Sequence, residues 1–304
     1  MGNARLPASL FVLTLAIAQA QDASVAGPAF GILFDPAAGA LRPLAGIPGS
    51  ARLGDPIPNT AGLAVAAPAP GGRYALAVES DSGALVVISG DSRRPVAGAR
   101  AGAVRLKLSP NGSAAAVQAG DFVQIIRGLP NAPEISFEIP AADPAVFSVA
   151  DDAANVIIAS HGRTVAYRPD GSEELLLESE AVTGVEHVAG SVEAILADES
   201  TGAVWRVGAD EPALLVEPAD GEHPFIAALI GGKLVTVTRR GGITVGAGED
   251  ARQFDCACRA SGLELAAPSL LKLNAADSGV PVWMIDLRAP EPQLAFVPPS
   301  EVAR

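Results

Sequence analysis

The chain has 304 residues, a length that fits either one large all-β domain or two ordinary domains. Its 32 glycines and 25 prolines, with only 4% aromatic residues, favour many short strands joined by tight turns and argue against a separate helical domain. The formal net charge is −13 and no run of arginine or lysine could track a phosphate backbone, which argues against nucleic-acid binding.

The N-terminus, residues 1–20, is predicted to be a signal peptide. Arg5 supplies a positive start, Leu10–Ile17 is an apolar core, and Ala18-Gln19-Ala20 is a small-x-small cleavage site. An uncleaved membrane anchor is the alternative, but the apolar run is shorter than the roughly 20 residues that span a bilayer. We therefore expect residues 21–304 to form a single mature domain with no membrane span, in the periplasm or outside the cell.

After the signal peptide, one unit recurs along the chain: an apolar strand, a small polar turn and a second apolar strand. It is clearest in Ala75–Glu79, Ser80–Gly83 and Ala84–Ile88. A period of about forty residues with strand-turn-strand content is typical of the four-stranded blade of a β-propeller. The last turn residue of each unit recurs at separations of 44, 38, 42, 39, 40 and 37 residues, at Gly39, Gly83, Asp121, Arg163, Gly202, Gly242 and Gly279.

These seven units predict an all-β fold, a seven-bladed β-propeller, with six or eight blades as the alternative. A further apolar run precedes several hairpins, such as Val104–Leu108, and is expected to be the innermost strand of its blade. The ring could close in two ways. Gln293–Val297 could be the outermost strand of the last blade, or Asp22–Ala26 of the mature N-terminus could pair there.

Two of the turns that follow the inner strands carry a recognisable pattern. Ala69-Pro70-Gly71-Gly72-Arg73-Tyr74-Ala75-Leu76-Ala77-Val78 and Ser109-Pro110-Asn111-Gly112-Ser113-Ala114-Ala115-Ala116-Val117 resemble the Ser-Pro-Asp-Gly-Arg-x-Leu-Ala-Val element of exported propellers related to TolB-like and lactonase-type repeats. The resemblance implies a propeller fold. Propellers of this shape host enzymes, binding proteins and scaffolds, so it implies no particular function.

The sequence contains no recognisable catalytic or metal-binding motif. It has no GxSxG, HExxH or P-loop pattern, and its three histidines are too few for a metal centre built from several histidine ligands. We therefore predict no catalytic residue, no metal and no cofactor.

The turns after the second strand of each blade and the connections between blades are expected to share one face of the ring, which is where propellers usually bind ligands. Arginine presents a rigid donor fork suited to carboxylates and phosphates, so this face could bind a protein or a small anionic ligand. A solvated polar rim is the alternative, and solvated turns are likewise the alternative to calcium binding by Asp198-Glu199 or Asp151-Asp152. The candidate binding residues are His161, Arg163, Asp198, Glu199, Arg239 and Arg240.

Cys256 and Cys258 are the two cysteines of the chain, and export to the periplasm or the cell exterior makes their oxidation plausible. A disulfide or clip between blades six and seven is the first interpretation. Two free thiols or an intermolecular bond is the second, and a redox or metal-binding role is the third.

Two functional hypotheses follow from the sequence. The first is a non-enzymatic binding or scaffold propeller in the cell envelope, because the sequence shows the repeats of the fold clearly but no recognisable set of catalytic residues. The second is a lactonase-type or esterase-type hydrolase that uses carboxylates and a metal in the central channel. The second requires inward-pointing acidic or histidine side chains from several blades.

Overall fold

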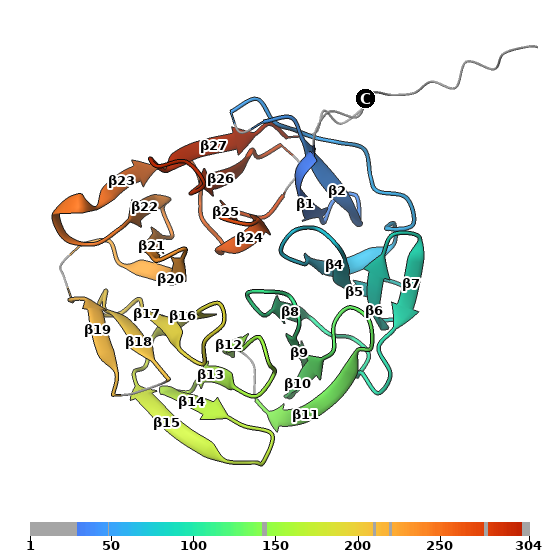
Figure 1. The fold of residues 1–304 in the computed structure, drawn as a ribbon, viewed down its shortest axis with the longest axis horizontal. Coiled ribbons are helices and arrows are strands. Elements are labelled where there is room, and N and C mark those ends of the chain that lie inside the picture. Colours follow the sequence, from blue (N-terminus) through green and yellow to red (C-terminus); the bar gives the residue numbers. More distant parts are fainter. Residues whose placement is uncertain are drawn as a thin grey trace, which may run out of the picture.

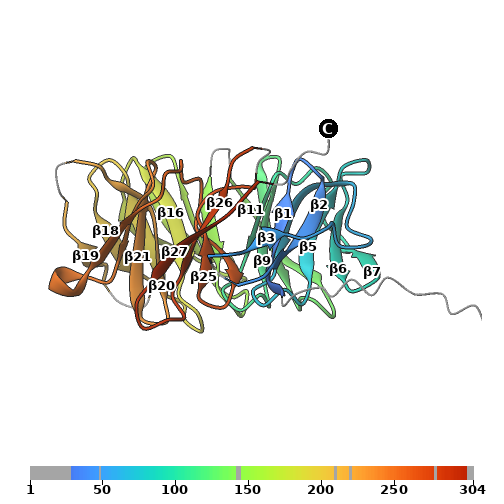
Figure 2. The ribbon, with the colours of Figure 1, turned by 90° about the horizontal axis from the view of Figure 1, so that it is seen from above.

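The structure is a computed structural model that describes residues 29–47, 49–141, 145–208, 211–218, 221–276 and 279–299. Its strands form seven antiparallel sheets arranged radially around a common axis (Figure 1). Seen from the side, the sheets form a flat ring with turns on both faces (Figure 2). The predicted seven-bladed β-propeller is confirmed. The predicted signal peptide and the Asp22–Ala26 segment lie outside the described residues.

Each sheet is one blade, and consecutive strands of a blade are neighbours in the sheet. Blade 1 contains β1 (Ala29–Asp35), β2 (Ala40–Ala45) and β3 (Arg52–Leu53); blade 2 contains β4 (Leu63–Pro68), β5 (Ala75–Glu79), β6 (Leu85–Ser89) and β7 (Ser92–Pro95). Blade 3 contains β8 (Arg105–Leu108), β9 (Ala115–Ala119), β10 (Phe122–Arg127) and β11 (Glu134–Pro140); blade 4 contains β12 (Val146–Val149), β13 (Val156–Ser160), β14 (Arg163–Tyr167) and β15 (Glu173–Glu178). Blade 5 contains β16 (Val182–His187), β17 (Ala194–Asp198), β18 (Val204–Val207) and β19 (Ala213–Val216); blade 6 contains β20 (Pro224–Ile230), β21 (Lys233–Thr238), β22 (Gly242–Val245) and β23 (Arg252–Asp255), with the 3₁₀ turn η1 (Gly248–Asp250) before β23. Blade 7 contains β24 (Glu264–Ala267), β25 (Leu270–Lys272), β26 (Val282–Asp286) and β27 (Gln293–Val297).

The hydrophobic core lies between the blades. Within the described residues it divides into seven clusters, each shared by two neighbouring blades. Between blades 2 and 3, for example, Leu76 and Val87 pack in one cluster with Val117 and Ile126. A central strand is covered on both sides by other blades, which explains why runs such as Ala75–Glu79 are apolar at nearly every position instead of alternating. Packing all round the ring is therefore what makes each blade stable.

Blade 1 has three described strands. The turn between β1 and β2 matches the turn between the second and third strands of other blades, because the carbonyl oxygen of Gly39 accepts a hydrogen bond from Leu63 N (2.9 Å) as that of Gly83 does from Gly102 N (2.9 Å). β1, β2 and β3 therefore correspond to the second, third and fourth strands of a complete blade. β1 contacts the inner strands β24 and β4 on its two sides (Figure 1).

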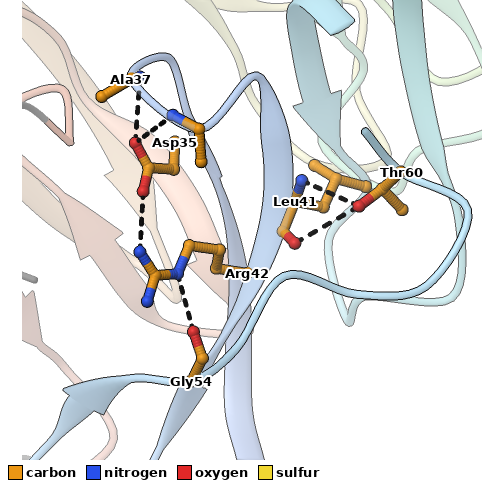
Figure 3. Close-up of polar contacts among 7 residues, drawn as sticks. Asp35, Ala37, Leu41, Arg42, Gly54 and Thr60 are labelled. Atoms are coloured by element: carbon orange, nitrogen blue, oxygen red, sulfur yellow. Dashed lines mark hydrogen bonds and ion pairs between the residues drawn. The ribbon is translucent and has the colours of Figure 1, made fainter. Parts of the chain in front are cut away.

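Polar contacts hold blade 1 to the connection that follows it (Figure 3). The carboxylate of Asp35 accepts hydrogen bonds from the turn amides, including Ala37 N at 3.0 Å, and forms an ion pair with Arg42 (3.0 Å). Arg42 Nε also donates to the carbonyl oxygen of Gly54 (2.7 Å), and Thr60 Oγ1 accepts from Leu41 N (3.1 Å). Asp35 therefore stabilises its own blade.

The ring closes without a blade that combines strands from both ends of the described chain. The predicted outermost strand Gln293–Val297 is β27, which pairs with β26 inside blade 7. Side chains of blade 1, among them Leu33 and Leu44, then pack against Leu270 and Met284 of blade 7. We call this packed contact between blades 1 and 7 the seam.

Candidate functional site

The turn face is the face formed by the turns between second and third strands together with the connections between blades. One backbone hydrogen bond places these two kinds of segment side by side in several blades. The carbonyl oxygens of Asp121, Gly162 and Gly241 accept from the amides of Ala141, Ser179 and Cys256, at 2.9, 3.0 and 3.0 Å. The sequence-based expectation that both kinds of segment share one face therefore agrees with this geometry.

Glu199 and Arg239 meet between blades 5 and 6 on the turn face. Arg239 Nε lies 2.5 Å from Glu199 Oε1, and its Nη2 lies 2.8 Å from Oε2, so the contact is bidentate. The guanidinium carbon also lies 4.8 Å from the ring centroid of Phe225. The hydrogen bond from Arg239 to Glu199 raises the pKa of the already basic guanidinium. Glu199 and Phe225 thus hold the Arg239 side chain in place.

Arg240 and Arg259 differ from Arg239. Both are exposed, and neither guanidinium group makes a hydrogen bond or ion pair with another described residue. Only the backbone amide of Arg240 is bound, to Glu222 Oε1 at 3.0 Å. Donor groups in this state remain open to an anionic ligand.

Two shallow depressions of the turn face meet at Arg239 and Arg240. Both are open to solvent, which suits the surface of another macromolecule better than a small enclosed ligand. One is lined by Arg239, Arg240, Asp255, Cys256, Ala257, Cys258 and Arg259, and the other by Glu199, Gly221, Glu222, His223, Arg239 and Arg240.

The remaining candidates lie apart from this group. Asp198 is only 5% exposed, and its carboxylate accepts from Ser179 Oγ and Ser200 Oγ, each at 2.6 Å. Burial alone would raise the pKa of Asp198, but these hydrogen bonds outweigh it and lower the pKa. His161 lies in the turn of blade 4 and Arg163 begins β14, and neither lines the depressions that contain Glu199, Arg239 and Arg240. Asp198 therefore supports its turn, while His161 and Arg163 form no common site with the arginines of blade 6.

A disulfide joins Cys256 and Cys258 in the connection from blade 6 to blade 7, with a Cα–Cα distance of 5.1 Å. It lies directly against the turn of blade 6, because a Cβ atom added at Gly241 would be 2.6 Å from Cys256 Sγ. Cys256 itself is 1% exposed. The bond therefore constrains the backbone that carries Arg259 and the neighbouring wall of the first depression.

We expect the purified mature protein to contain this disulfide in solution. Alkylation without reductant should leave the mass unchanged, and alkylation after reduction should add two groups. Reduction should lower the free energy of unfolding by only about 1–2 kcal/mol, since the closed loop is very short. A Cys256→Ser/Cys258→Ser variant should be insensitive to reductant. Two modified thiols in the untreated protein would contradict the expectation.

The central channel contains a charged group that sequence reasoning missed. Lys107 on β8 forms an ion pair with Glu186 on β16, and Lys272 on β25 forms one with Glu264 on β24 (2.6 Å). The four side chains come from blades 3, 5 and 7 and line one cavity of about 210 Å³. We call these residues the channel quartet.

The quartet is electrostatically coupled. Burial raises the pKa of Glu186, an effect that Lys107 opposes and Glu264 strengthens. Lys272 lowers the pKa of Glu264, and Lys107 contributes in the same direction. Charges from separate blades therefore act on one another across the channel.

His187 also belongs to the channel wall, but its ring is buried between blades 4 and 5. Its Nδ1 lies 2.9 Å from Ser148 Oγ, while its Nε2 is buried without a hydrogen-bond partner among the described residues. Burial lowers the pKa of His187 to about 4, although Asp151 and Asp152 act in the opposite direction. The ring is therefore neutral at physiological pH.

We expect His187 to titrate near pH 4 in the folded protein. An unfolded histidine binds a proton near pH 6.5, so folding stability should fall by about 3 kcal/mol as the pH drops from 6.5 to 4 and should not fall further from this group. Proton NMR can follow the three histidine rings, with His187→Gln identifying the signal. A His187 ring that titrates near pH 6.5 would contradict the structure.

The channel residues do not fit a metal ion. No group of three or more histidine, cysteine or acidic side chains is close enough to hold one among the described residues. The two channel carboxylates instead face lysines. Asp151 and Asp152, considered above as calcium ligands, bind backbone amides, with Asp151 accepting from Asn111 N and Gly190 N, both at 2.8 Å.

Comparisons with known proteins identify the fold and no family. No protein-family model matches the chain, and no curated protein sequence does. A functionally unknown protein from Desulfotomaculum acetoxidans DSM 771 is similar in structure, with a TM-score of 0.62 and 12% identity over 90% of this chain and 100% of that one. The chain is a seven-bladed propeller.

Two further solved structures share this shape. PorZ, an essential bacterial surface component of the type-IX secretion system of Porphyromonas gingivalis, matches with a TM-score of 0.57 and 14% identity over 90% of this chain, which spans only 39% of PorZ. Apo AztD from Citrobacter koseri matches with a TM-score of 0.53 and 12% identity over 90% of this chain and 83% of AztD. At such identities the likeness concerns the fold alone. None of the described helical segments is long and apolar enough to cross a membrane.

Proposed function

We propose that the protein is an exported, non-enzymatic binding or scaffold propeller of the cell envelope that binds a carboxylate-bearing protein partner at its turn face. The observation that carries the proposal is the pair Arg240 and Arg259. They line one depression, and their guanidinium groups have no partner among the described residues, whereas Arg239 beside them is fixed by Glu199. A rigid wall with two open guanidinium groups suits the bidentate binding of carboxylates.

The exported address is part of the proposal. It rests on the signal-peptide pattern of residues 1–20 and on the likeness of two turns to those of TolB-like and lactonase-type exported propellers. The structural similarity to PorZ, a bacterial surface component, supports the same address. Envelope fractions should contain a protein that begins at Gln21. A protein that keeps Met1 and stays in the cytoplasm would contradict the proposed export.

The metal-assisted hydrolase is the weaker hypothesis. It needs several inward-pointing metal ligands, and the two carboxylates that line the channel cavity in the described part of the chain are already paired with lysines. No observation favours lactone or ester hydrolysis.

The partner site can be tested by crosslinked capture from an envelope extract of the source organism. The bait is mature protein, used beside an Arg240→Ala/Arg259→Ala variant and an Arg52→Ala/Arg73→Ala control. The control removes two exposed arginines outside both depressions and keeps the net charge equal to that of the test variant. We expect one partner to be retained by the wild type and the control, lost by the test variant and released by salt. Identical capture by all three proteins, or no capture, would contradict the proposed site.

A further inference from the structure

The channel quartet leaves several of its polar atoms unused. Lys107 binds Oε1 of Glu186, and Lys272 binds Oε2 of Glu264. The other carboxylate oxygen of each pair makes no hydrogen bond with any described residue. Each ammonium group has three donors, and one contact is formed by each. Both pairs therefore keep capacity for a further polar ligand inside the channel.

The quartet is accessible from the cavity although it lies inside the ring. The side chain of Glu264 keeps 59% of its surface exposed, and that of Lys107 keeps 26%. Charged groups in a narrow, partly desolvated channel interact more strongly with a ligand than the same groups do on an open surface. This is the setting in which a small charged molecule can be held by few contacts.

The charges of the quartet sum to zero, with two positive and two negative groups. A ligand with a single charge would be attracted by one pair of like groups and repelled by the other. A zwitterion avoids this conflict because each end of the ligand can face groups of the opposite sign.

Apart from Ser109, Ser148 and His187, the rest of the cavity wall is apolar. A ligand that filled the cavity would therefore bury an aliphatic body against these side chains, at about 25 cal/mol per Å² of apolar surface removed from water. The volume of about 210 Å³ restricts the ligand to a small molecule. The larger apolar wall residues are Ile32, Leu33, Val65, Leu106, Leu108, Ile230, Leu263, Leu265 and Leu271.

We propose that the central channel binds a small zwitterion with an aliphatic body, of the class of the aliphatic α-amino acids. Its ammonium group contacts the free carboxylate oxygens of Glu186 and Glu264. Its carboxylate group contacts Lys107 and Lys272. The site is separate from the turn face and does not depend on the function proposed for it.

The ligand class can be tested by isothermal titration calorimetry with L-leucine as the probe. Isocaproate carries the carboxylate alone, isoamylamine carries the ammonium alone, and L-serine carries both charges on a polar body. We expect L-leucine to bind at millimolar or lower concentration and the other three to bind roughly tenfold or more weakly, a difference of about 1.4 kcal/mol. No binding of L-leucine, or equal binding of either single-charge compound, would overturn the proposal.

The location can be tested with charge-neutral double variants. Glu264→Gln/Lys272→Met removes one channel pair and should weaken L-leucine binding by roughly tenfold or more. Arg127→Met/Glu134→Gln removes a surface pair, 59% and 60% exposed, and should leave binding within about twofold of the wild type. Equal L-leucine affinity in both variants would place the ligand elsewhere and overturn the proposal.

A second variant covers the case in which the first does not fold. Ile230→Trp fills the cavity from β20 without removing a charge and should abolish L-leucine binding. Arg240→Ala/Arg259→Ala should bind L-leucine as the wild type does, so failure of the channel site and failure of the turn-face site can be told apart. Wild-type affinity for L-leucine in a folded Ile230→Trp protein would overturn the proposal.

Discussion

Replacing Lys107 by methionine should lower the free energy of unfolding by about 2–4 kcal/mol at neutral pH, because the carboxylate of Glu186 loses its partner inside the channel. The value lies below that of a fully buried pair since the Lys107 side chain is 26% exposed and water can reach the site. Removing both partners, in Lys107→Met/Glu186→Leu, should restore most of the stability. Urea unfolding of the wild type, the two single variants and the double variant gives the coupling energy directly.

The pH dependence gives a second check on this pair. Burial already raises the pKa of Glu186, and loss of Lys107 should raise it further. When folding raises the pKa of a carboxyl group, the free energy of unfolding falls as the pH rises through that pKa. The destabilisation caused by Lys107→Met should therefore grow with pH. Arg127→Met, in a surface ion pair, should cost no more than about 1 kcal/mol at any pH. Equal costs for the two variants would show that the channel pair is not desolvated.

Replacing Gly184 by alanine should destabilise the protein by about 2–3 kcal/mol. Gly184 lies on β16, where a Cβ atom would be 2.7 Å from Ile226 Cα and 2.9 Å from Phe225 O on β20. Both contacts are with backbone, so blades 5 and 6 would have to move apart and their shared apolar cluster would loosen.

Gly262→Ala is the matched control. Gly262 also lacks a positive φ, and its Cβ atom would meet only Glu264 Oε1, at 3.8 Å. This substitution should be neutral or slightly stabilising, because alanine restricts the unfolded chain more than glycine does. Urea unfolding of both variants measures the difference. Equal stability of the two would mean that blades 5 and 6 are not in close contact at this strand.

The sequence was sufficient for the blades because their signals are local. An apolar strand, a turn and a second apolar strand can be recognised within about fifteen residues, and the turns at Gly83 and Gly202 have the positive φ that such turns need. Of the two ways of closing the ring that the sequence leaves open, the structure has the one in which Gln293–Val297 is a strand of the last blade. The fold therefore followed from hydrophobic pattern and period together.

The polar sites needed information that a local pattern does not hold. Arg239 binds Glu199, 40 residues earlier, and Asp151 binds Asn111, also 40 residues apart, which is one repeat in each case. Contacts between neighbouring blades could therefore have been sought at one-repeat separations.

The Lys107–Glu186 pair spans 79 residues, close to two repeats, and crosses the channel. Predicting this pair requires knowing where each inner strand lies around the ring and which of its side chains point into the channel. That arrangement depends on how the seam closes. A hint existed in the sequence, because Lys107 lies in a run expected to be an inner strand and lysine is rare in this chain.

The seam is a place where the ring can open without the unfolding of a blade. Every sheet of the described residues lies within one blade, and the one isolated bridge between described residues of different blades, Ala97 with Glu134, joins blades 2 and 3. Blades 1 and 7 are therefore joined by packed side chains such as Leu33 against Leu270. Parting them would break no described strand ladder, whereas unfolding any blade would break several. Separating blades 1 and 7 at the seam should therefore cost less free energy than unfolding a blade. Such an opening would make the channel reachable from the side of the ring.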